Sequence, residues 1–287
     1  MNCISLATYD SVTIEVIGKS YEGRDQRVVK ICQDGCGAKN IMYIEGGIHA
    51  REWMSPAVVT YMINELTVNA ANNADMLENL DWYILPVTNP DGYEYTKEDR
   101  YWRKTRSLNE GWDCIGTDAN RNFEYEYGGE GQSDLPCSNT YSGSGPASEI
   151  EITNVQNFIL ANKDRIKFFN DMHSYASLVL LPWGYSSETN ADLDDQLTLF
   201  TRAAEACFAV HGEAYVVGPL HDTLYAASGI SVDFAYGAAG IKYSTTIELR
   251  DSSDGFDPPP ETIILESEEM WAFHRSAAVD IIAEYVP

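Results

Sequence analysis

The sequence lacks any long hydrophobic run. No stretch of about 18 apolar residues occurs, so no membrane-spanning helix is expected. Residues 1–20 also lack the basic start and apolar segment of a secretory signal peptide. We therefore expect no membrane partner, and the chain to be a mature form, a truncated form or a cytosolic protein.

Basic residues are scarce, with 19 Lys and Arg against 44 Asp and Glu, for a formal net charge of -25. A surface of this sign repels nucleic acids and anionic membranes, which excludes both as expected partners. It does not identify a substrate, because bulk charge does not define a pocket. Hydrophobic residues make up 44% of the chain, so disorder is not the default expectation.

Cysteines are too few for a disulfide-dense scaffold in a chain of 287 residues. No Cys-x-x-Cys pair occurs, so a thiolate zinc site is not expected. One or two disulfides would suit an oxidising compartment, although spacing alone does not assign their connectivity. The six cysteines are Cys3, Cys32, Cys36, Cys114, Cys137 and Cys207.

Repeats, low-complexity segments and long linkers are also missing, so we expect a single domain over residues 1–287. Apolar runs bounded by turn residues predict strands, several of them continuous enough to be buried on both faces. The predicted strands span 41–45, 82–87, 166–171, 177–181 and 243–249. Helical patterns alternate with them, which favours an α/β/α sandwich with a mixed, mostly parallel central sheet covered by helices.

Three local patterns refine this picture. Ser148 and Glu151 have the spacing of a capping box before a helical pattern. The three prolines at 258–260 indicate the lead-in to a last helix. Residues 101–144 are rich in Gly, Asn, Ser and Tyr without periodicity, and a loop of this length is usually functional. Cys114 and Cys137 lie inside it, so a disulfide could hold it.

The sequence offers one set of metal ligands. His49 and Glu52 are three residues apart, just after a predicted strand and two glycines, so an imidazole and a carboxylate can converge on one ion. His173 ends another apolar strand. Two His and one Glu leave a zinc position open, as in catalytic sites, where zinc polarises a carbonyl and lowers the pKa of water.

The alternative for each residue is structural. A lone His-x-x-Glu pair occurs often by chance, and His173 could be a core histidine. Only five histidines are present, however, and two lie at matching strand ends. His211, His221 and His274 lack such a setting, and we expect them to be structural or exposed.

Six segments taken together resemble the zinc metallocarboxypeptidases of the carboxypeptidase A/B type. The resemblance runs from about residue 17 to residue 282, and the order of the segments makes it specific. The segments are GGIHAREW, NPDGY, WRKTRS, DANRNF, DMHSY and GIKYSTTIELRD.

The resemblance implies a role for each matching residue in the hydrolysis of a C-terminal peptide bond. It makes His49, Glu52 and His173 the ligands of one zinc ion. Asp118 would orient the first histidine, as metal-bound histidines require. Glu248 would be the general base, and its place in an apolar strand argues against an exposed salt-bridge carboxylate.

Further residues would recognise the substrate. Arg103 would polarise the scissile carbonyl, although a solvated surface charge is its alternative beside Lys104 and Arg106. Asn120 and Arg121 would hold the terminal carboxylate, for which a guanidinium is suited. The resemblance also implies a mobile capping tyrosine at Tyr225, outer subsites at Arg51 and Tyr175, and a disulfide between Cys114 and Cys137. Cys32 and Cys36 could close a small loop, and Cys3 and Cys207 have no clear partner.

The predicted specificity pocket is apolar. In this family an aspartate at its floor gives a basic preference, and the matching residue here is Val232. An unpaired cation would be costly there, which predicts a preference for aliphatic or aromatic C-terminal residues. Ile230 is larger than the usual small residue and should favour aliphatic side chains. The other pocket positions are Leu180, Gly184, Leu220, Leu224, Ala227 and Thr246.

The N-terminus departs from the family, since the 48 residues before His49 are too few for a pro-domain and a truncated start is expected. We expect a secreted monomer acting on peptides or proteins with a free C-terminus. Three alternatives stay open: a basic-preferring B-type enzyme, an inactive peptide-binding homologue, and an enzyme that acts on acylated amino acids.

Overall fold

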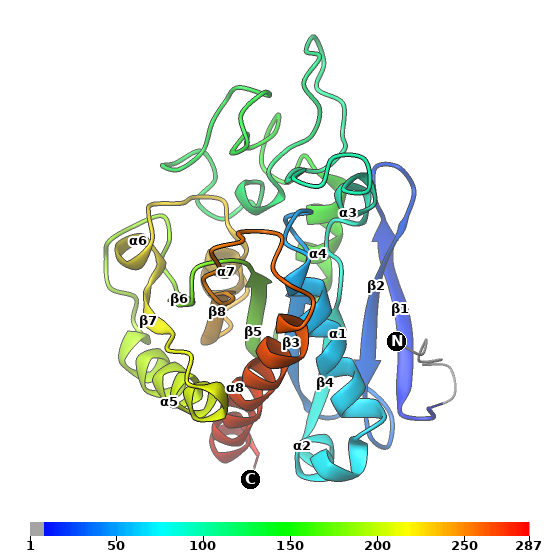
Figure 1. Cartoon of the computed structure of the whole chain (residues 1–287), viewed down its shortest axis with the longest axis vertical. Coiled ribbons are helices and arrows are strands. Elements are labelled where there is room, and N and C mark those ends of the chain that lie inside the picture. The colour runs from blue at the N-terminus through cyan, green and yellow to red at the C-terminus, as the bar shows by residue number, and fades with distance from the viewer. Residues whose placement is uncertain (1–8, 287) are drawn as a thin grey trace.

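The protein is described by a computed structural model over residues 9–286. These residues form one eight-stranded sheet in the order β1-β2-β4-β3-β5-β8-β6-β7 (Figure 1). The central neighbours β4, β3, β5 and β8 are parallel, whereas β1, β2 and β6 join antiparallel. The strands are β1 (Val12–Lys19), β2 (Asp25–Ile31), β3 (Asn40–Gly46), β4 (Leu80–Leu85), β5 (Ile166–His173), β6 (Leu178–Leu181), β7 (Val216–Pro219) and β8 (Tyr243–Glu248).

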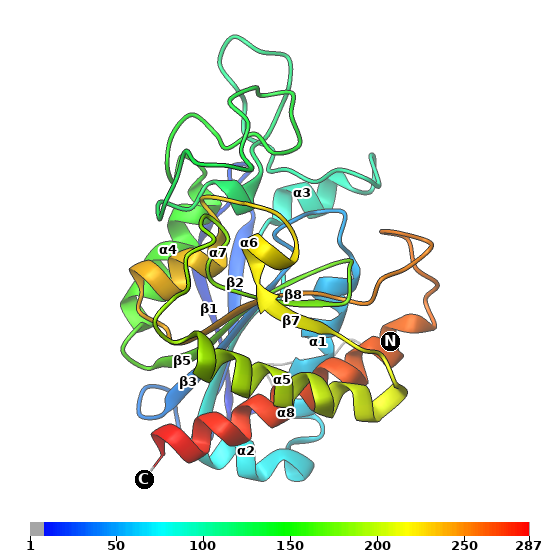
Figure 2. The ribbon, with the colours of Figure 1, turned by 90° about the vertical axis from the view of Figure 1, so that its left-hand side faces the viewer.

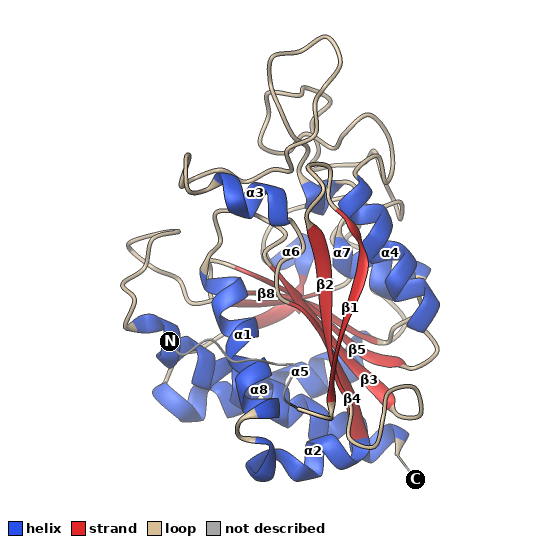
Figure 3. Cartoon of the chain, turned by 90° about the vertical axis from the view of Figure 1, so that its right-hand side faces the viewer, coloured by secondary structure: helices blue, strands red, loops and turns tan. Residues whose placement is uncertain are grey.

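Helices cover both faces of this sheet, so the predicted α/β/α sandwich is confirmed (Figures 2 and 3). Helices α1 (Met54–Thr67), α5 (Leu193–His211) and α8 (Thr262–Tyr285) share one apolar core with one face of the sheet. Helix α4 (Ile150–Asn162) lies on the other face with the short α7 (Ser231–Asp233) and the turn 234–238. The remaining short helices are α2 (Ala74–Asn79), α3 (Pro90–Tyr95), α6 (Leu220–Thr223), and the turns Ala70–Asn73 and Ala119–Arg121. None of the described helices is both long and apolar enough to cross a membrane.

The capping box predicted for Ser148 and Glu151 is wrong. Helix α4 begins at Ile150, which makes Glu149 its N-cap residue, one position after Ser148. The carboxylate of Glu151 instead accepts a hydrogen bond of 2.9 Å from the backbone N–H of Tyr21 in the β1–β2 turn. The side chain of Glu151 therefore makes a tertiary contact with Tyr21 instead of capping the helix.

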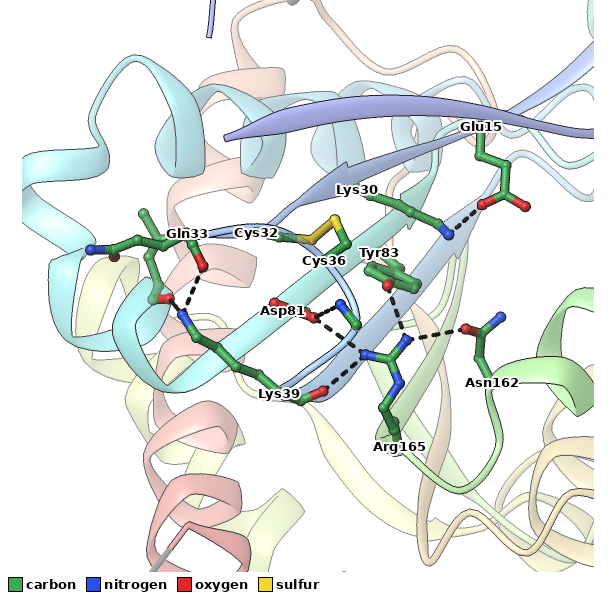
Figure 4. The surroundings of a disulfide bond; sticks show 12 residues. Glu15, Lys30, Cys32, Gln33, Cys36, Lys39, Asp81, Tyr83, Asn162 and Arg165 are labelled. Atoms are coloured by element: carbon green, nitrogen blue, oxygen red, sulfur yellow. Dashed lines mark hydrogen bonds and ion pairs between the residues drawn. A yellow bond between two sulfur atoms is a disulfide. The ribbon is translucent and has the colours of Figure 1, made fainter. Parts of the chain in front are cut away.

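Two disulfides are present among the described residues. Cys114–Cys137 closes the long loop that projects at the top of Figure 1, as predicted. Cys32–Cys36 closes the short loop between β2 and β3, close to Asp81 and Arg165 (Figure 4). Cys207 is a buried free thiol, and Cys3 lies outside the described residues.

Candidate metal centre

The first two candidate ligands lie in the turn that leaves the carboxyl end of β3. Gly47 has φ +68°, a conformation that favours glycine, and a Cβ there would also lie 3.2 Å from Pro56. The hydroxyl of Ser55, at the start of α1, accepts from Gly47 N and donates to the carbonyl of Met172 in β5. This serine therefore holds the turn of His49 and Glu52 beside the strand end that carries His173.

Three ligand atoms converge at this point. Glu52 Oε1 lies 2.9 Å from His49 Nδ1, and Glu52 Oε2 lies 3.1 Å from His173 Nδ1. The two Nδ1 atoms are 3.1 Å apart. Within residues 9–286, His49, Glu52 and His173 form a group that could hold a metal ion, because their ligand atoms all lie within 4.8 Å of one another.

The outer nitrogens of the two rings indicate which kind of ligand this group suits. His49 Nε2 lies 3.0 Å from Asp118 Oδ1, and His173 Nε2 lies 2.9 Å from Asp171 Oδ2. Each carboxylate favours a hydrogen on Nε2, so a ring in its neutral form directs the lone pair of Nδ1 toward Glu52. Lone pairs and a carboxylate repel one another unless a cation lies between them.

The pKa shifts point the same way. Burial would raise the pKa of Glu52, but His49 and His173 hold it below its ordinary value. Burial would lower the pKa of His173, yet Asp171 and Glu52 raise it well above its ordinary value. The group thus attracts positive charge, and two imidazoles with one carboxylate are a donor set that suits Zn²⁺.

Asp118 connects the metal group to Arg103. Its Oδ2 accepts from Arg103 Nε and a terminal nitrogen at 3.1 and 2.8 Å, while its Oδ1 faces His49. Burial would lower the pKa of Arg103, but Asp118 and Glu52 raise it. Asp118 thus fixes the guanidinium, and the Arg103 carbonyl, which accepts from Ala50 N, ties its backbone to the turn of the candidate ligands.

Glu248 ends β8, where it is the direct cross-strand neighbour of His173. Burial raises the pKa of Glu248 to about 7, although His173 and Arg103 lower it. The pairing of β5 with β8 therefore places a further carboxylate beside His49, Glu52 and His173. This carboxylate is not one of the three convergent side chains.

A cavity contains these groups together with apolar side chains. The lining residues include the polar side chains of His49, His173, Arg103, Asn120, Arg121 and Tyr225. Arg121 donates to the carbonyls of Gly131 and Asn120, and its guanidinium lies 5.9 Å from the Tyr225 ring. The other lining residues are Leu180, Leu220, Leu224, Ala227, Ile230, Thr246 and Glu248.

The apolar wall matches most of the predicted pocket. Val232 is fully buried in the same cluster as Leu180 and Ile230, rather than among the lining side chains. A Cβ on Gly184 would lie 2.5 Å from Ile230 Cδ1, so Ile230 fills the space that the glycine leaves.

Arg51 and Tyr175 form a separate surface group around Phe256, which the sequence did not single out. The Arg51 guanidinium lies 4.2 Å from the Phe256 ring, and the Tyr175 ring lies 5.0 Å from it. Neither residue lines the cavity of the metal group.

Comparison with known proteins decides the family. The model of the zinc carboxypeptidase family matches residues 1–273 of the chain. The chain belongs to the zinc carboxypeptidase family. It is accordingly a zinc metallocarboxypeptidase, a hydrolase that acts on peptides, as the resemblance implied.

Relatives of both named types are found for this carboxypeptidase. Carboxypeptidase B of Astacus astacus is 44% identical over 98% of this chain and 93% of that protein. Carboxypeptidase A4 of Mus musculus is 41% identical over 89% of this chain and 61% of that protein. The structure of bovine thrombin-activatable fibrinolysis inhibitor in complex with tick carboxypeptidase inhibitor matches with a TM-score of 0.90 and 38% identity, covering 96% of this chain and 92% of that one.

Two residues beside the candidate ligands of this carboxypeptidase, Asp171 and Ser231, were not predicted from the sequence. Asp171 is two residues from His173 on β5, and alternate residues of a strand share a face. That spacing could have indicated a carboxylate on the same side as the ligand. Ser231 could not have been found this way, because it reaches Asp171 from a helix 60 residues further along the chain.

Proposed function

We propose that the chain removes one C-terminal residue at a time from peptides, with one zinc ion held by His49, Glu52 and His173. When bound, zinc supplies a Lewis acid that polarises the scissile carbonyl and lowers the pKa of water. The convergence of the three ligand atoms and the two carboxylates behind the histidines support this ligand set.

Glu248 performs the proton transfers in this proposal. Its carboxylate accepts the proton of the attacking water and returns it to the nitrogen of the departing residue. Arg103 directs its positive charge to the carbonyl oxygen, where negative charge develops. Asp118 supports this role because it fixes the guanidinium through two hydrogen bonds.

Asn120, Arg121 and Tyr225 make the enzyme an exopeptidase. A guanidinium matches a terminal carboxylate in geometry and charge, and the buried Arg121 lies in the cavity that also holds the metal histidines. Tyr225 is half exposed on the same cavity and can cover the bound chain end. The group of Arg51, Tyr175 and Phe256 supplies contacts for residues before the scissile bond.

The preferred C-terminal residue is apolar, and aliphatic rather than aromatic. The side-chain end of the cavity is lined by Leu180, Leu220, Leu224, Ala227 and Ile230. Burying an aliphatic side chain there contributes about 1.5–3 kcal/mol, whereas a lysine ammonium would lose its water without a counter-charge. Ile230 occupies the room beside Gly184 that a larger ring would need.

The observation that carries this proposal is one cavity that combines the metal group, two arginines and an apolar wall. Its test is the hydrolysis of blocked dipeptides that end in Leu, Phe or Lys, with and without a chelator. We expect kcat/KM in the order Leu, Phe, Lys, and loss of all activity on metal removal. Activity that survives complete metal removal would contradict the mechanism.

A preference for basic residues is the second candidate, because a 44% identical relative is named carboxypeptidase B. Faster release of Lys than of Leu would establish it in place of the apolar preference. Without activity on any dipeptide, the chain would be a peptide-binding homologue.

We further propose that the chain acts as a secreted monomer with a single catalytic domain. Two disulfides support an oxidising compartment. One continuous sheet carries the metal ligand His173, its neighbour Glu248 and the wall residue Leu180, which supports a single domain.

A further inference from the structure

His173 needs one defined tautomer to act as a metal ligand. Its Nδ1 faces Glu52 and His49, so the hydrogen of the neutral ring must be on Nε2. Two groups lie within reach of Nε2, Asp171 Oδ2 at 2.9 Å and the side-chain nitrogen of Asn120 at 3.2 Å. An amide nitrogen cannot accept a hydrogen bond, which leaves Asp171 as the acceptor.

Asp171 is itself held in place. It is fully buried, and its Oδ2 also accepts from the Ser231 hydroxyl at 2.5 Å. The backbone N–H of Ser231 donates to Asn120 Oδ1 at 2.8 Å, which turns the Asn120 amide nitrogen toward the histidine. Ser231, at the start of α7, thus contacts both groups that lie beside His173 Nε2.

A second buried carboxylate faces Asp171 across the sheet. Glu45 on β3 is the direct partner of Asp171 on β5, and the Tyr43 hydroxyl donates to Glu45 Oε2 at 2.7 Å. Burial and the charge of Asp171 raise the pKa of Glu45 well above its ordinary value. Tyr43 thus holds Glu45, whereas the Ser231 hydroxyl and His173 Nε2 contact Asp171.

We propose that Asp171, held by Ser231, is the positioning residue of His173, so that the metal centre contains two carboxylate–histidine units. Asp118 serves His49, and Asp171 serves His173, each through Nε2 at 2.9–3.0 Å. A carboxylate behind a ligand histidine fixes the ring and raises the basicity of the ligand nitrogen, and its loss weakens metal binding about 10–100-fold. The inference rests on the proposed ligand set.

The test measures zinc affinity of the whole chain by competition with a chromophoric chelator, independently of activity. We expect Asp171→Ser to raise the zinc dissociation constant about 10–100-fold. Asp171→Asn should cost less, because its amide oxygen can still accept from Nε2. Ser231→Ala, which keeps the carboxylate but removes the hydroxyl that holds it, should weaken binding a few-fold.

Two reference variants make the result specific. Asp118→Asn removes the charge behind the other histidine and should weaken zinc binding as Asp171→Asn does. Asp81→Asn removes an equally buried carboxylate at the start of β4 and should leave zinc affinity unchanged. Unfolding of each metal-free variant in urea shows whether the protein folds before zinc is added.

The outcomes separate this inference from the proposed function. Zinc affinity within twofold of wild type in Asp171→Ser, together with weakened binding in Asp118→Asn, would overturn the role of Asp171 alone. A wild-type chain that binds no zinc would overturn the ligand set, and this inference with it. If Asp171→Ser does not fold, Ser231→Ala decides, and unchanged affinity there counts against the proposal.

Discussion

At the scale of single residues, the proposed role of Glu248 in proton transfer can be tested separately from metal binding. Its carboxylate is the cross-strand neighbour of His173 but is not among the three convergent ligands. We expect Glu248→Gln to lower kcat about 10²–10⁴-fold, since an amide cannot accept the proton of water. Zinc content and the affinity for a competitive inhibitor should be unchanged, because the amide keeps the size of the side chain.

The control for this variant is Glu188→Gln, which changes an exposed carboxylate that is not part of the cavity. It should keep wild-type kcat. If Glu248→Gln retained most of its activity at full zinc occupancy, another group would be the general base.

The sequence predicted the side chains whose roles depend on local spacing or strand ends. His49 and Glu52 could be paired because three residues separate them, and His173 because it ends an apolar strand. Asp171 was missed although its position two residues before His173 places both side chains on one face of the strand. Contacts between residues far apart in the chain, such as Ser231 with Asp171, need the fold.

At the scale of elements, the two disulfides close loops of very different length. The sequence separation is 23 for Cys114–Cys137 and 4 for Cys32–Cys36. A disulfide lowers the entropy of the unfolded chain more when it closes a longer loop. We therefore expect the double variant Cys114→Ser/Cys137→Ser to lose about 3.5 kcal/mol of unfolding free energy, and Cys32→Ser/Cys36→Ser to lose about 2 kcal/mol. Urea unfolding of the two double variants measures both values.

The short loop has other contacts that persist without its disulfide. Gly37 N donates to Asp81, and Lys39 donates to the carbonyls of Gln33 and Leu77 (Figure 4). The variant without Cys32–Cys36 should therefore fold and keep its activity, which makes it the matched control. A larger loss of stability at 32 and 36 than at 114 and 137 would contradict the entropic argument.

Helix α8 is joined to β5 by a buried histidine that must stay neutral. His274 Nδ1 donates to the Met270 carbonyl at 2.7 Å, and Nε2 accepts from Asn170 at 2.8 Å. Burial lowers the pKa of His274 from 6.5 to about 4. Between these values the unfolded chain binds the proton and the folded chain does not, so stability falls as the pH drops from 6.5 to 4, by up to roughly 3 kcal/mol.

The non-titrating variant His274→Gln isolates this effect. We expect the stability difference between wild type and His274→Gln to shrink as the pH falls from 7 to 4, measured by urea unfolding. A constant difference between wild type and His274→Gln would show that the buried ring does not resist protonation.

The elements that the sequence predicted are those with continuous apolar runs. The strands β3, β4, β5, β6 and β8 were found with shifts of one or two residues at their ends. Strands β1, β2 and β7 were not predicted. Asp25, Arg27 and Lys30 interrupt the apolar pattern of β2, and the four residues of β7 show no period. All three strands lie away from the parallel centre of the sheet.

At the scale of the whole molecule, the alternation of strands and helices predicted the α/β/α architecture. The order and direction of the strands then explain why the candidate site residues lie together. The parallel strands β3 and β5 end at the same edge, so the candidate ligands after β3 and at the end of β5 meet there. Strand β8 is parallel to β5 and delivers Glu248 to that edge. The net charge does not determine the fold, because it acts on the stability of the compact state.

The charge does predict a response to salt. With a net charge of -25 at pH 7, the folded chain repels itself over distances that dilute buffer does not screen. Raising NaCl from about 0.01 to about 0.15 M shortens the screening length from roughly 30 to 8 Å. We expect this to stabilise the protein by on the order of 1 kcal/mol, or about 2–4 °C in Tm. Near pH 4.3, the sequence pI, the same salt step should have little effect, because the net charge is close to zero. An unchanged or lower Tm in salt at pH 7 would mean that attractive ion pairs outweigh the repulsion among the excess carboxylates.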